Sequence, residues 1–509
     1  MTRELSKIYS AQLEGVDAKL IEVEVDINVG THVFTIVGLA DKALNEARER
    51  VNSALKNSGI RPPNHENRRI TINLAPADIK KRGSQYDLAI AIGYLVATGQ
   101  MGHFDARDKM FIGELALDGD VRPINGALSI AEMARRLGFK TIFIAEINAN
   151  EAAAIKGITI IPVKKLIDLI EYLEERKNIE ATVFSPQKSE GAVVPDLSEI
   201  KGQENAKRAL MIAAAGGHNL LMIGPPGVGK SFLARALGGV LPDLSRDEAI
   251  EVTKILSAAG FRLNGLVTHR PFRAPHQTAS TASLIGGGQD PRPGEISMAH
   301  HGILFLDELP EFSKSSLESL RQPMESGSVC VARAKQSIVF PARFSLVAAM
   351  NPCPCGYYGD PDRACACSGY EVLKYQKKIS GPLLDRIDIQ LKVGRVKLDE
   401  LRKGSDGGPS SPRIKKIITD ARRTQQKRFE GLLISTNAGM SSRDVNHFIH
   451  CDAKAEKFLT TLNTKDLSPR AYYRVLKVAR TIADIEGNDT VTAENLAEAY
   501  GYRLRDEAL

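Results

Sequence analysis

The sequence predicts an α/β protein with about three domains, and three observations support this prediction. Short β-rich runs alternate with helical stretches up to about residue 173. A buried-strand run then passes through a glycine-rich loop into a helix at residues 219–237. Beyond residue 412 the apolar residues recur at helical spacing almost throughout.

The first domain is predicted at residues 1–175 and has an α+β or α/β pattern. The next stretch, 176–195, loses this periodicity and gains charged residues, serine and proline, which indicates a linker. The expected strands of the first domain are 20–27, 32–37, 69–74, 141–144 and 159–162, and its expected helices are 42–58, 86–98, 128–137 and 163–173.

The second domain is predicted at residues 196–395 and begins with a helix at 204–215. A run rich in glycine, serine and proline at 403–412 indicates a second linker. The rest of the chain, within 396–509, is predicted to be a helical domain. The buried-strand runs expected in the parallel sheet of the second domain are 219–223, 303–306 and 344–350.

The composition excludes wholesale disorder, because 43% hydrophobic and 25% charged residues are an ordinary globular mixture. A net charge of +7 permits a polyanionic partner without demonstrating one. Tryptophan is absent and aromatic residues are 6%, so base stacking is not expected to be the main contact with any nucleic acid. We see no signal peptide and no run of the ~18–20 apolar residues of a membrane helix, so we expect a cytoplasmic protein without a membrane partner.

The strongest motif is residues 224–231, which fit the phosphate-binding pattern G-x-x-x-x-G-K-[ST]. Because a buried strand precedes it and a helix follows, we predict a site for ATP and Mg²⁺ rather than a plain glycine-rich turn. Lys230 would reach the β- and γ-phosphates, and Ser231 would ligate Mg²⁺. The predicted nucleotide-binding residues of this loop are Gly224, Pro225, Pro226, Gly227, Val228, Gly229, Lys230 and Ser231.

Two further strand ends carry polar side chains. Asp307 and Glu308 follow an apolar run, where the first acid can hold Mg²⁺ and the second can activate water for attack on the γ-phosphate. Asn351 follows another strand, and its amide can position that water. The alternative for Asn351 is a turn-initiating residue before Pro352.

Four of the six cysteines stand within fifteen positions, as Cys353-x-Cys355 and Cys365-x-Cys367. Four thiolates suit a tetrahedral Zn²⁺ ion, although this spacing is shorter than the common C-x₂₋₄-C. We expect a structural zinc site. Free thiols and a redox role are the alternatives.

Three longer sequence segments resemble those of a known family: HRPFRAPH at 269–276, MNPCPCGYYGDP at 350–361 and ISGPLLDRIDI at 379–389. With the motifs above, they resemble AAA+ ATPases of the magnesium-chelatase/MCM branch. Over its whole length the chain is similar to the ComM/YifB type. The resemblance implies an ATP-hydrolysing DNA helicase that promotes branch migration in natural transformation, on single-stranded and branched DNA and with recombination proteins. The alternative is a chelatase- or chaperone-like ATPase that remodels a protein partner.

The resemblance also assigns roles to individual residues. Asp307 and Glu308 match the Walker B pair, and Asn351 matches sensor 1. Arg386 matches an arginine finger that acts across a subunit boundary, which implies a ring, expected to be a hexamer. Arg470 matches the sensor 2 arginine of a helical lid. From the residues alone, Arg386 could instead form an ion pair with Asp385 or Asp388.

The first domain resembles the proteolytic domain of Lon, through residues 113–128 and 138–144. Gln85 falls at the position of Lon's nucleophile and Leu128 at that of its lysine. Neither side chain can carry out acyl transfer, and Ser84 is one position off. We expect a Lon-like α+β fold without protease activity, which serves assembly, DNA contact or partner contact.

The expected DNA contacts are cations that would face a ring pore and bind phosphates. Arg333 and Lys335 lie at the tip of a predicted hairpin, 329–340. Arg270 and Arg273 lie in an insertion that follows the helix after the phosphate-binding loop. A solvated hairpin tip is the alternative for the first pair.

Overall fold

The computed structural model describes residues 5–31, 33–39, 44, 46–65, 67–102, 104–186, 194–288, 291–332, 337–396, 409–461 and 468–503. The chain divides into two compact units. The first contains Met1–Ser189 and Arg246–Thr268, and the second contains Glu190–Ser245 and His269–Leu509. Among the described residues, no helix is long and apolar enough to cross a membrane.

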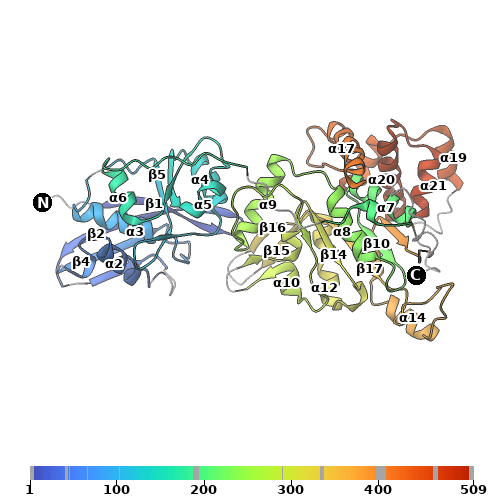
Figure 1. The fold of residues 1–509 in the computed structure, drawn as a ribbon, viewed down its shortest axis with the longest axis horizontal. Coiled ribbons are helices and arrows are strands. Elements are labelled where there is room, and N and C mark those ends of the chain that lie inside the picture. The colour runs from blue at the N-terminus through green and yellow to red at the C-terminus, as the bar shows by residue number, and fades with distance from the viewer. Residues whose placement is uncertain are drawn as a thin grey trace. The chain divides into compact units, whose positions relative to one another are not determined.

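A seven-stranded sheet is the centre of the first unit (Figure 1), with the strand order β3-β4-β2-β1-β5-β8-β9. Strand β2 pairs antiparallel with β1 and β4, and the other neighbours run parallel. The strands are β1 Ser6–Glu14, β2 Asp17–Val29, β3 Val33–Val37, β4 Arg68–Ala75, β5 Lys109–Ile112, β8 Thr141–Ala145 and β9 Thr159–Val163, beside a small pair, β6 Glu114–Leu115 and β7 Val121–Arg122.

Helices cover both faces of this sheet, because alternate residues of its inner strands enter two different cores. Phe111 and Phe143 pack with α2, α3 and α6, whereas Met110 and Ile142 pack with α4 and α5. This arrangement confirms a mixed α/β domain, one of the two patterns predicted for the N-terminal region. The helices are α2 Ala47–Asn57, α3 Asp87–Thr98, α4 Ala127–Arg136, α5 Glu146–Ala152 and α6 Leu166–Leu173, with a 3₁₀ turn at Pro63–His65.

Helix α9, Arg246–Ala258, lies inside the predicted second domain in sequence but belongs to the first unit in space. The Ser257 hydroxyl oxygen accepts a hydrogen bond from the Gly126 N–H at 2.9 Å. Lys254 forms an ion pair with Glu132 at 2.9 Å. The chain therefore leaves the second unit after its first sheet strand and returns to it before the next.

Five parallel strands form the sheet of the second unit, in the order β11-β14-β17-β10-β18. The parallel sheet predicted for this region is confirmed. Because all neighbours are parallel, the carboxyl ends of the strands meet at one edge. The strands are β10 Leu220–Ile223, β11 Phe272–Arg273, β14 Ile303–Leu306, β17 Ser345–Met350 and β18 Ile389–Lys392.

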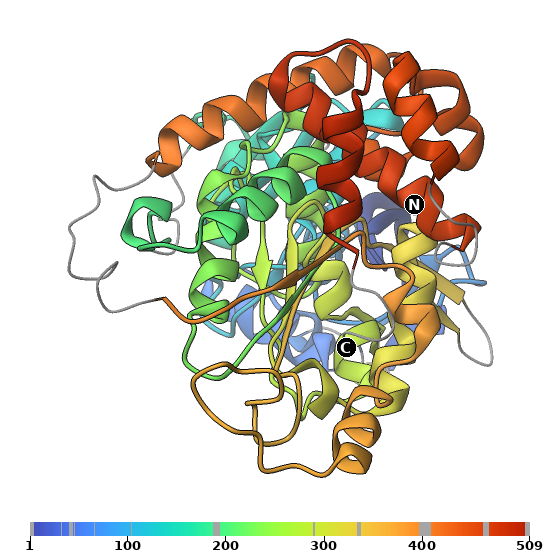
Figure 2. The ribbon, with the colours of Figure 1, turned by 90° about the vertical axis from the view of Figure 1, so that its right-hand side faces the viewer.

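The remaining elements of the second unit surround this sheet. The C-terminal helices lie at one end of the unit and α14 at the opposite end (Figure 1 and Figure 2). Two antiparallel hairpins are β12 Gly286–Gly287 with β13 Arg292–Pro293, and β15 Ser328–Ala332 with β16 Ser337–Pro341. The helices are α7 Glu204–Gly216, α8 Lys230–Val240, α10 Thr281–Ile285, α11 Glu295–Met298, α12 Lys314–Ser319, α13 Arg321–Ser326, α14 Gly369–Gln376, α15 Gly381–Leu384, α17 Ser411–Arg428, α18 Ser442–Phe448, α19 Ala453–Thr461, α20 Pro469–Glu486 and α21 Ala493–Gly501, with 3₁₀ turns at Leu197–Glu199, Leu309–Glu311 and Asn437–Gly439.

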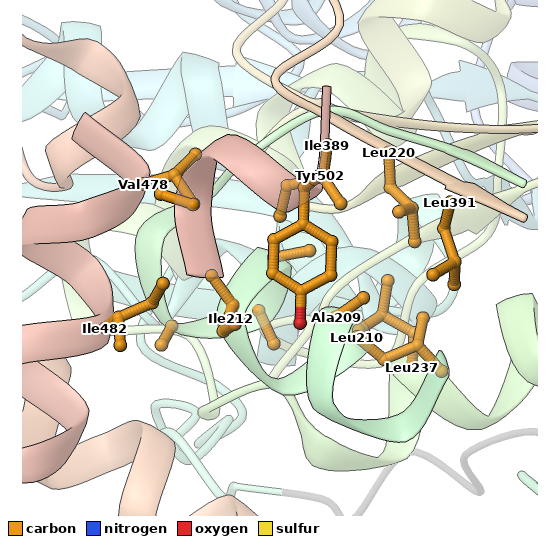
Figure 3. Packing of buried hydrophobic residues seen from close by; sticks show 14 of the residues in the cluster. Ala209, Leu210, Ile212, Leu220, Leu237, Ile389, Leu391, Val478, Ile482 and Tyr502 are labelled. Carbon is orange, nitrogen blue, oxygen red and sulfur yellow. The ribbon is translucent and has the colours of Figure 1, made fainter. Parts of the chain in front are cut away.

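The C-terminal helices and the sheet share one apolar core. Tyr502, just after α21, lies between α7 and the sheet, and its carbonyl accepts the Gln390 N–H at 2.8 Å (Figure 3). The predicted helical C-terminal region is therefore confirmed, and it packs as part of the second unit. The neighbours labelled around Tyr502 are Ala209, Leu210, Ile212, Leu220, Leu237, Ile389, Leu391, Val478 and Ile482.

Candidate functional site

The predicted phosphate-binding loop lies where three parallel strands end together. Ile223 of β10 pairs with Met350 of β17, so the loop starts beside Asn351. The Gly224 N–H donates to the Met350 carbonyl at 3.2 Å. Strand β14 pairs with the other side of β17, which brings Asp307 to the same edge. The topology therefore brings together the three motifs that the sequence placed far apart.

Lys230 occupies the centre of this site. Its Nζ donates to the carbonyls of Gly224 at 2.6 Å and Pro225 at 2.8 Å, and to Asn351 Oδ1 at 3.1 Å. Gly229, the residue before it, has a φ of +88°, a conformation that favours glycine and lets the loop turn into α8. The Lys230 ammonium group therefore lies against the loop backbone, beside the end of β17.

Ser231 and Asp307 form the second contact of the site. The Ser231 hydroxyl donates to Asp307 Oδ2 at 2.6 Å, and Asp307 Oδ1 accepts the Glu308 N–H at 3.0 Å. A hydroxyl and a carboxylate are hard oxygen ligands, so this pair fits a Mg²⁺ ion. Glu308 is exposed and has a φ of +50°, a strained backbone conformation for a residue with a side chain and typical of functional sites.

Burial lowers the pKa of Lys230 to about 8, against the opposing influence of the Asp307 and Glu308 charges. The side chain lies at 8% exposure, in the loop that surrounds it. The ammonium group therefore carries its charge at neutral pH and loses it within a pH range that binding assays can reach.

The four clustered cysteines meet in a loop that follows β17. The Cys353 sulfur lies 3.3 Å from that of Cys355 and 3.7 Å from that of Cys365, and all four sulfurs, including that of Cys367, lie within 4.8 Å of one another. Around a tetrahedral Zn²⁺ ion with bonds of about 2.3 Å, sulfur atoms are separated by about 3.8 Å. The donor set therefore fits zinc.

Backbone N–H groups also point at these sulfurs. Tyr358 N–H donates to Cys353 Sγ at 3.3 Å, and Cys355 N–H donates to Cys367 Sγ at 3.4 Å. Such bonds stabilise thiolates over thiols, because the charged sulfur is the better acceptor. The backbone of the loop thus favours the deprotonated sulfurs that a metal ion binds.

The positions that match the Lon nucleophile and lysine lie in the first unit and hold no such pair. Gln85 donates from its amide nitrogen to the Arg82 carbonyl at 2.8 Å. Leu128 is fully buried. The Ser84 hydroxyl hydrogen-bonds the Glu114 carboxylate. The two matched positions therefore carry neither a nucleophile nor a lysine base.

Three family models match the chain. They are "Magnesium chelatase, subunit ChlI" at residues 196–401, "Subunit ChlI of Mg-chelatase" at 23–148 and "Magnesium chelatase, subunit ChlI C-terminal" at 408–503. The competence protein ComM of Haemophilus influenzae is 42% identical over 506 residues, which cover 98% of this chain and 97% of that protein. The chain belongs to the ComM/YifB family of magnesium-chelatase-like proteins.

Two further relatives show how far the similarity of this chain extends. The uncharacterized protein YifB of Escherichia coli is 43% identical over 508 residues, which cover 99% of this chain and 98% of that protein. The chloroplastic magnesium-chelatase subunit ChlI of Oryza sativa subsp. japonica is 24% identical over 362 residues, 65% of this chain and 80% of that protein. Membership of this AAA+ family indicates an ATPase that works with ATP and Mg²⁺.

In this ComM/YifB chain, Arg386, the residue that matches the arginine finger, has an ion-pair partner that the sequence did not predict. Arg386 is 6% exposed and forms an ion pair with Glu325, and its Nη1 donates to the Pro382 carbonyl at 2.7 Å. Neither aspartate beside it in sequence is that partner. Arg470, the residue that matches sensor 2, is exposed at the start of α20.

One buried group next to the finger was missed from the sequence. Asp388 forms an ion pair with Arg474, lies 3.4 Å from His218 Nδ1 and accepts the Asn219 N–H at 3.0 Å. Burial alone would raise the pKa of Asp388, but the Arg474 charge and the contact with His218 outweigh it and hold the pKa below its usual range. Arg474 lies one helical turn after Arg470, on the same side of α20. This spacing was the signal in the sequence that could have pointed to Arg474.

The predicted DNA contacts of this ComM/YifB chain have different outcomes. Arg333 and Lys335 lie outside the described residues, between the two strands of the β15–β16 hairpin. Arg270 donates to the His301 carbonyl at 2.7 Å, and Arg273 forms an ion pair with Glu295 at 2.7 Å. Both of these arginines have partners inside the chain, and their contact with DNA stays a prediction.

Proposed function

We propose that this chain is the subunit of a ring-shaped, ATP-driven motor that promotes branch migration of recombination intermediates during natural transformation. One observation supports the motor chemistry: Lys230 hydrogen-bonds Asn351, and Ser231 hydrogen-bonds Asp307, at the shared edge of parallel strands. The DNA substrate is supported by 42% identity over 98% of the chain to a protein named for competence.

The residues of the site divide the hydrolysis reaction between them. Lys230 and the loop N–H groups would bind the phosphates. Ser231 and Asp307 would hold Mg²⁺, which would supply charge neutralisation at the transferring phosphoryl group. Glu308 orients the attacking water and accepts its proton. Asn351 fixes the position of that water relative to the γ-phosphate.

Assembly completes the site, because Arg386 acts on the nucleotide of a neighbouring subunit. A finger supplied in trans is typically worth about 10³–10⁵ in rate. In the single chain this guanidinium already has an anionic partner, Glu325, so reaching a phosphate exchanges one negative partner for another. We propose a ring of six subunits, in which each finger serves the next site.

We also propose that Cys353, Cys355, Cys365 and Cys367 hold a structural zinc ion. The sulfur separations and the N–H donors to sulfur support this assignment. Elemental analysis of protein purified under reducing conditions should find about one equivalent of zinc per chain, and less than about half an equivalent would contradict the site. The double variant C365S/C367S should lose the metal, whereas C330S, which alters a cysteine outside the cluster, should keep it.

The motor proposal is tested by ATP hydrolysis with no DNA, with single-stranded DNA and with forked DNA. We expect DNA to stimulate hydrolysis and to bind with an affinity that falls as salt rises. The K230A variant, as control, should hydrolyse nothing under any condition. A hydrolysis rate that DNA does not change, together with no salt-sensitive DNA binding, would favour a second candidate function. That candidate is an ATPase that remodels a protein partner, which the 24% identity to a chelatase subunit suggests.

A further inference from the structure

The four-cysteine loop, residues 353–367, touches the phosphate-binding loop directly. A Cβ atom added to Gly356 would lie 2.6 Å from Cδ and 3.2 Å from Cγ of the Pro226 ring. Real Cβ atoms do not approach other atoms as closely as 2.6 Å, so the backbone of Gly356 rests against the proline ring and only glycine fits. Pro226 is the third residue of the predicted phosphate-binding motif.

The position of Gly356 is set by the cysteines around it. It follows Cys355 directly, and its N–H donates to the Cys353 carbonyl at 3.0 Å. The sulfurs of Cys353 and Cys355 belong to the cluster that fits a metal ion. A bound metal would therefore hold Gly356, the residue whose backbone rests on Pro226.

The same loop is held next to its start and at its middle. At its start, Asn351 accepts from Lys230 at 3.1 Å, and the Pro352 carbonyl accepts from Gln376 of α14 at 3.1 Å. Further along, the buried Asp360 pairs with Arg395, just after β18, at 3.2 Å. Because β10 lies between β17 and β18, the four-cysteine loop spans the strand that carries the phosphate-binding loop.

We infer that the four-cysteine loop is a brace for the phosphate-binding loop, so that occupancy of its metal site sets the affinity of the chain for nucleotide. Gly356 is a positioning residue that acts through Pro226, and the metal acts through Gly356. The inference rests on the proposed nucleotide and zinc sites and adds a coupling between them.

Two glycines of the same loop provide a matched pair for the test. Gly356 and Gly359 have φ values of +88° and +73°, so alanine strains the backbone at both positions. An added Cβ meets Pro226 only at Gly356, since nothing lies within 4 Å of the equivalent atom at Gly359. Any effect of G356A beyond that of G359A therefore reports the contact with the phosphate-binding loop.

The experiment measures zinc content and the Kd of a fluorescent ATP analogue with Mg²⁺ on the full chain. We expect G356A to keep its zinc and to raise the Kd about tenfold, while G359A keeps both close to wild type. P226A removes the ring atoms that the new Cβ meets, so the double variant P226A/G356A should bind close to P226A alone. A Kd for G356A equal to that of G359A, or a penalty unchanged in the P226A background, would overturn the brace.

Metal removal gives the second readout. Wild-type protein stripped by a chelator, with the chelator then removed, should bind the analogue more weakly and recover on addition of zinc. An equal Kd for the metal-free and the zinc-loaded protein would overturn the coupling, even if zinc is bound. Failure of untreated wild type to bind the analogue at all would instead contradict the proposed ATPase, and absence of zinc from it would contradict the metal site, so the possible failures are distinguishable.

Discussion

At the scale of single residues, the protonation of Lys230 should govern nucleotide binding. Its pKa is lowered to about 8 by burial, and the ammonium form is the one that attracts phosphates. Bound phosphates favour that form, so affinity should be constant below pH 8 and should fall above it by up to about tenfold per pH unit. The measurement is the Kd of the fluorescent ATP analogue at pH 7, 8 and 9.

The K230R variant is the control for this pH dependence, because its guanidinium stays charged over the whole range. Its affinity should be lower than that of wild type, since the longer group cannot repeat the three Nζ contacts, but the same at all three pH values. A wild-type affinity that does not change between pH 7 and 9 would contradict the lowered pKa.

Which residues the sequence predicted depends on how local their signals are. The phosphate-binding loop and the cysteines lie in short motifs, and the structure brings each set together as expected. The partner of Arg386 is Glu325, sixty-one residues away, and no pattern in the sequence links them. Arg273 shows the same limit, because its pairing with Glu295 joins two segments that meet only through the fold.

At the scale of elements, helix α5 of the first unit carries a buried acid whose charge should cost stability. Glu151 accepts the Leu128 N–H at 3.1 Å, and burial raises its pKa to about 7, although hydrogen bonds from Ser257 and Leu128 act in the opposite direction. The folded state therefore holds this proton more tightly than the unfolded state. The favourable contribution is fully present below about pH 4.5 and is lost as pH rises through about 7.

The E151Q variant should remove this pH dependence, because the amide stays neutral and keeps an oxygen to accept the Leu128 N–H. We expect its unfolding temperature to exceed that of wild type at pH 8 and to match it at pH 5, as measured by differential scanning calorimetry. E146Q, on the exposed side of the same helix, should change the unfolding temperature equally at both pH values. An E151Q effect that is the same at pH 5 and pH 8 would refute this account.

Elements were predictable where apolar residues follow a regular period. Helix α3 and strand β4 lie close to their predicted bounds. Strand β1 was missed because Ser6, Ser10 and Gln12 occupy buried positions and break the alternation of polar and apolar residues. The placement of α9 in the first unit was missed because its partners, such as Glu132, come from a segment more than a hundred residues earlier.

At the scale of the whole molecule, the trans role of Arg386 predicts that two inactive variants complement each other. K230A subunits lack a working site but keep the finger, and R386A subunits lack the finger but keep the site. In a random mixture, about a quarter of the interfaces combine an intact site with an intact finger. Hydrolysis by the mixture should recover to that fraction of wild type, whereas each variant alone stays inactive.

If mixed rings are shown to contain both K230A and R386A subunits and still hydrolyse no ATP, Arg386 would act on the nucleotide of its own subunit. The R386A protein should also bind the fluorescent ATP analogue as wild type does, because the finger contacts the neighbour's nucleotide. Loss of that binding would argue against a finger and for a structural role through Glu325.

The central claim is that ATP hydrolysis by this chain moves DNA branches, and strand displacement from a three-stranded DNA substrate tests it most directly. Wild type should release the labelled strand in the presence of ATP and Mg²⁺, and K230A and R386A should each release none above background. A hydrolysis-competent wild type that leaves the three-stranded substrate intact, under salt conditions in which it binds that DNA, would contradict the claim.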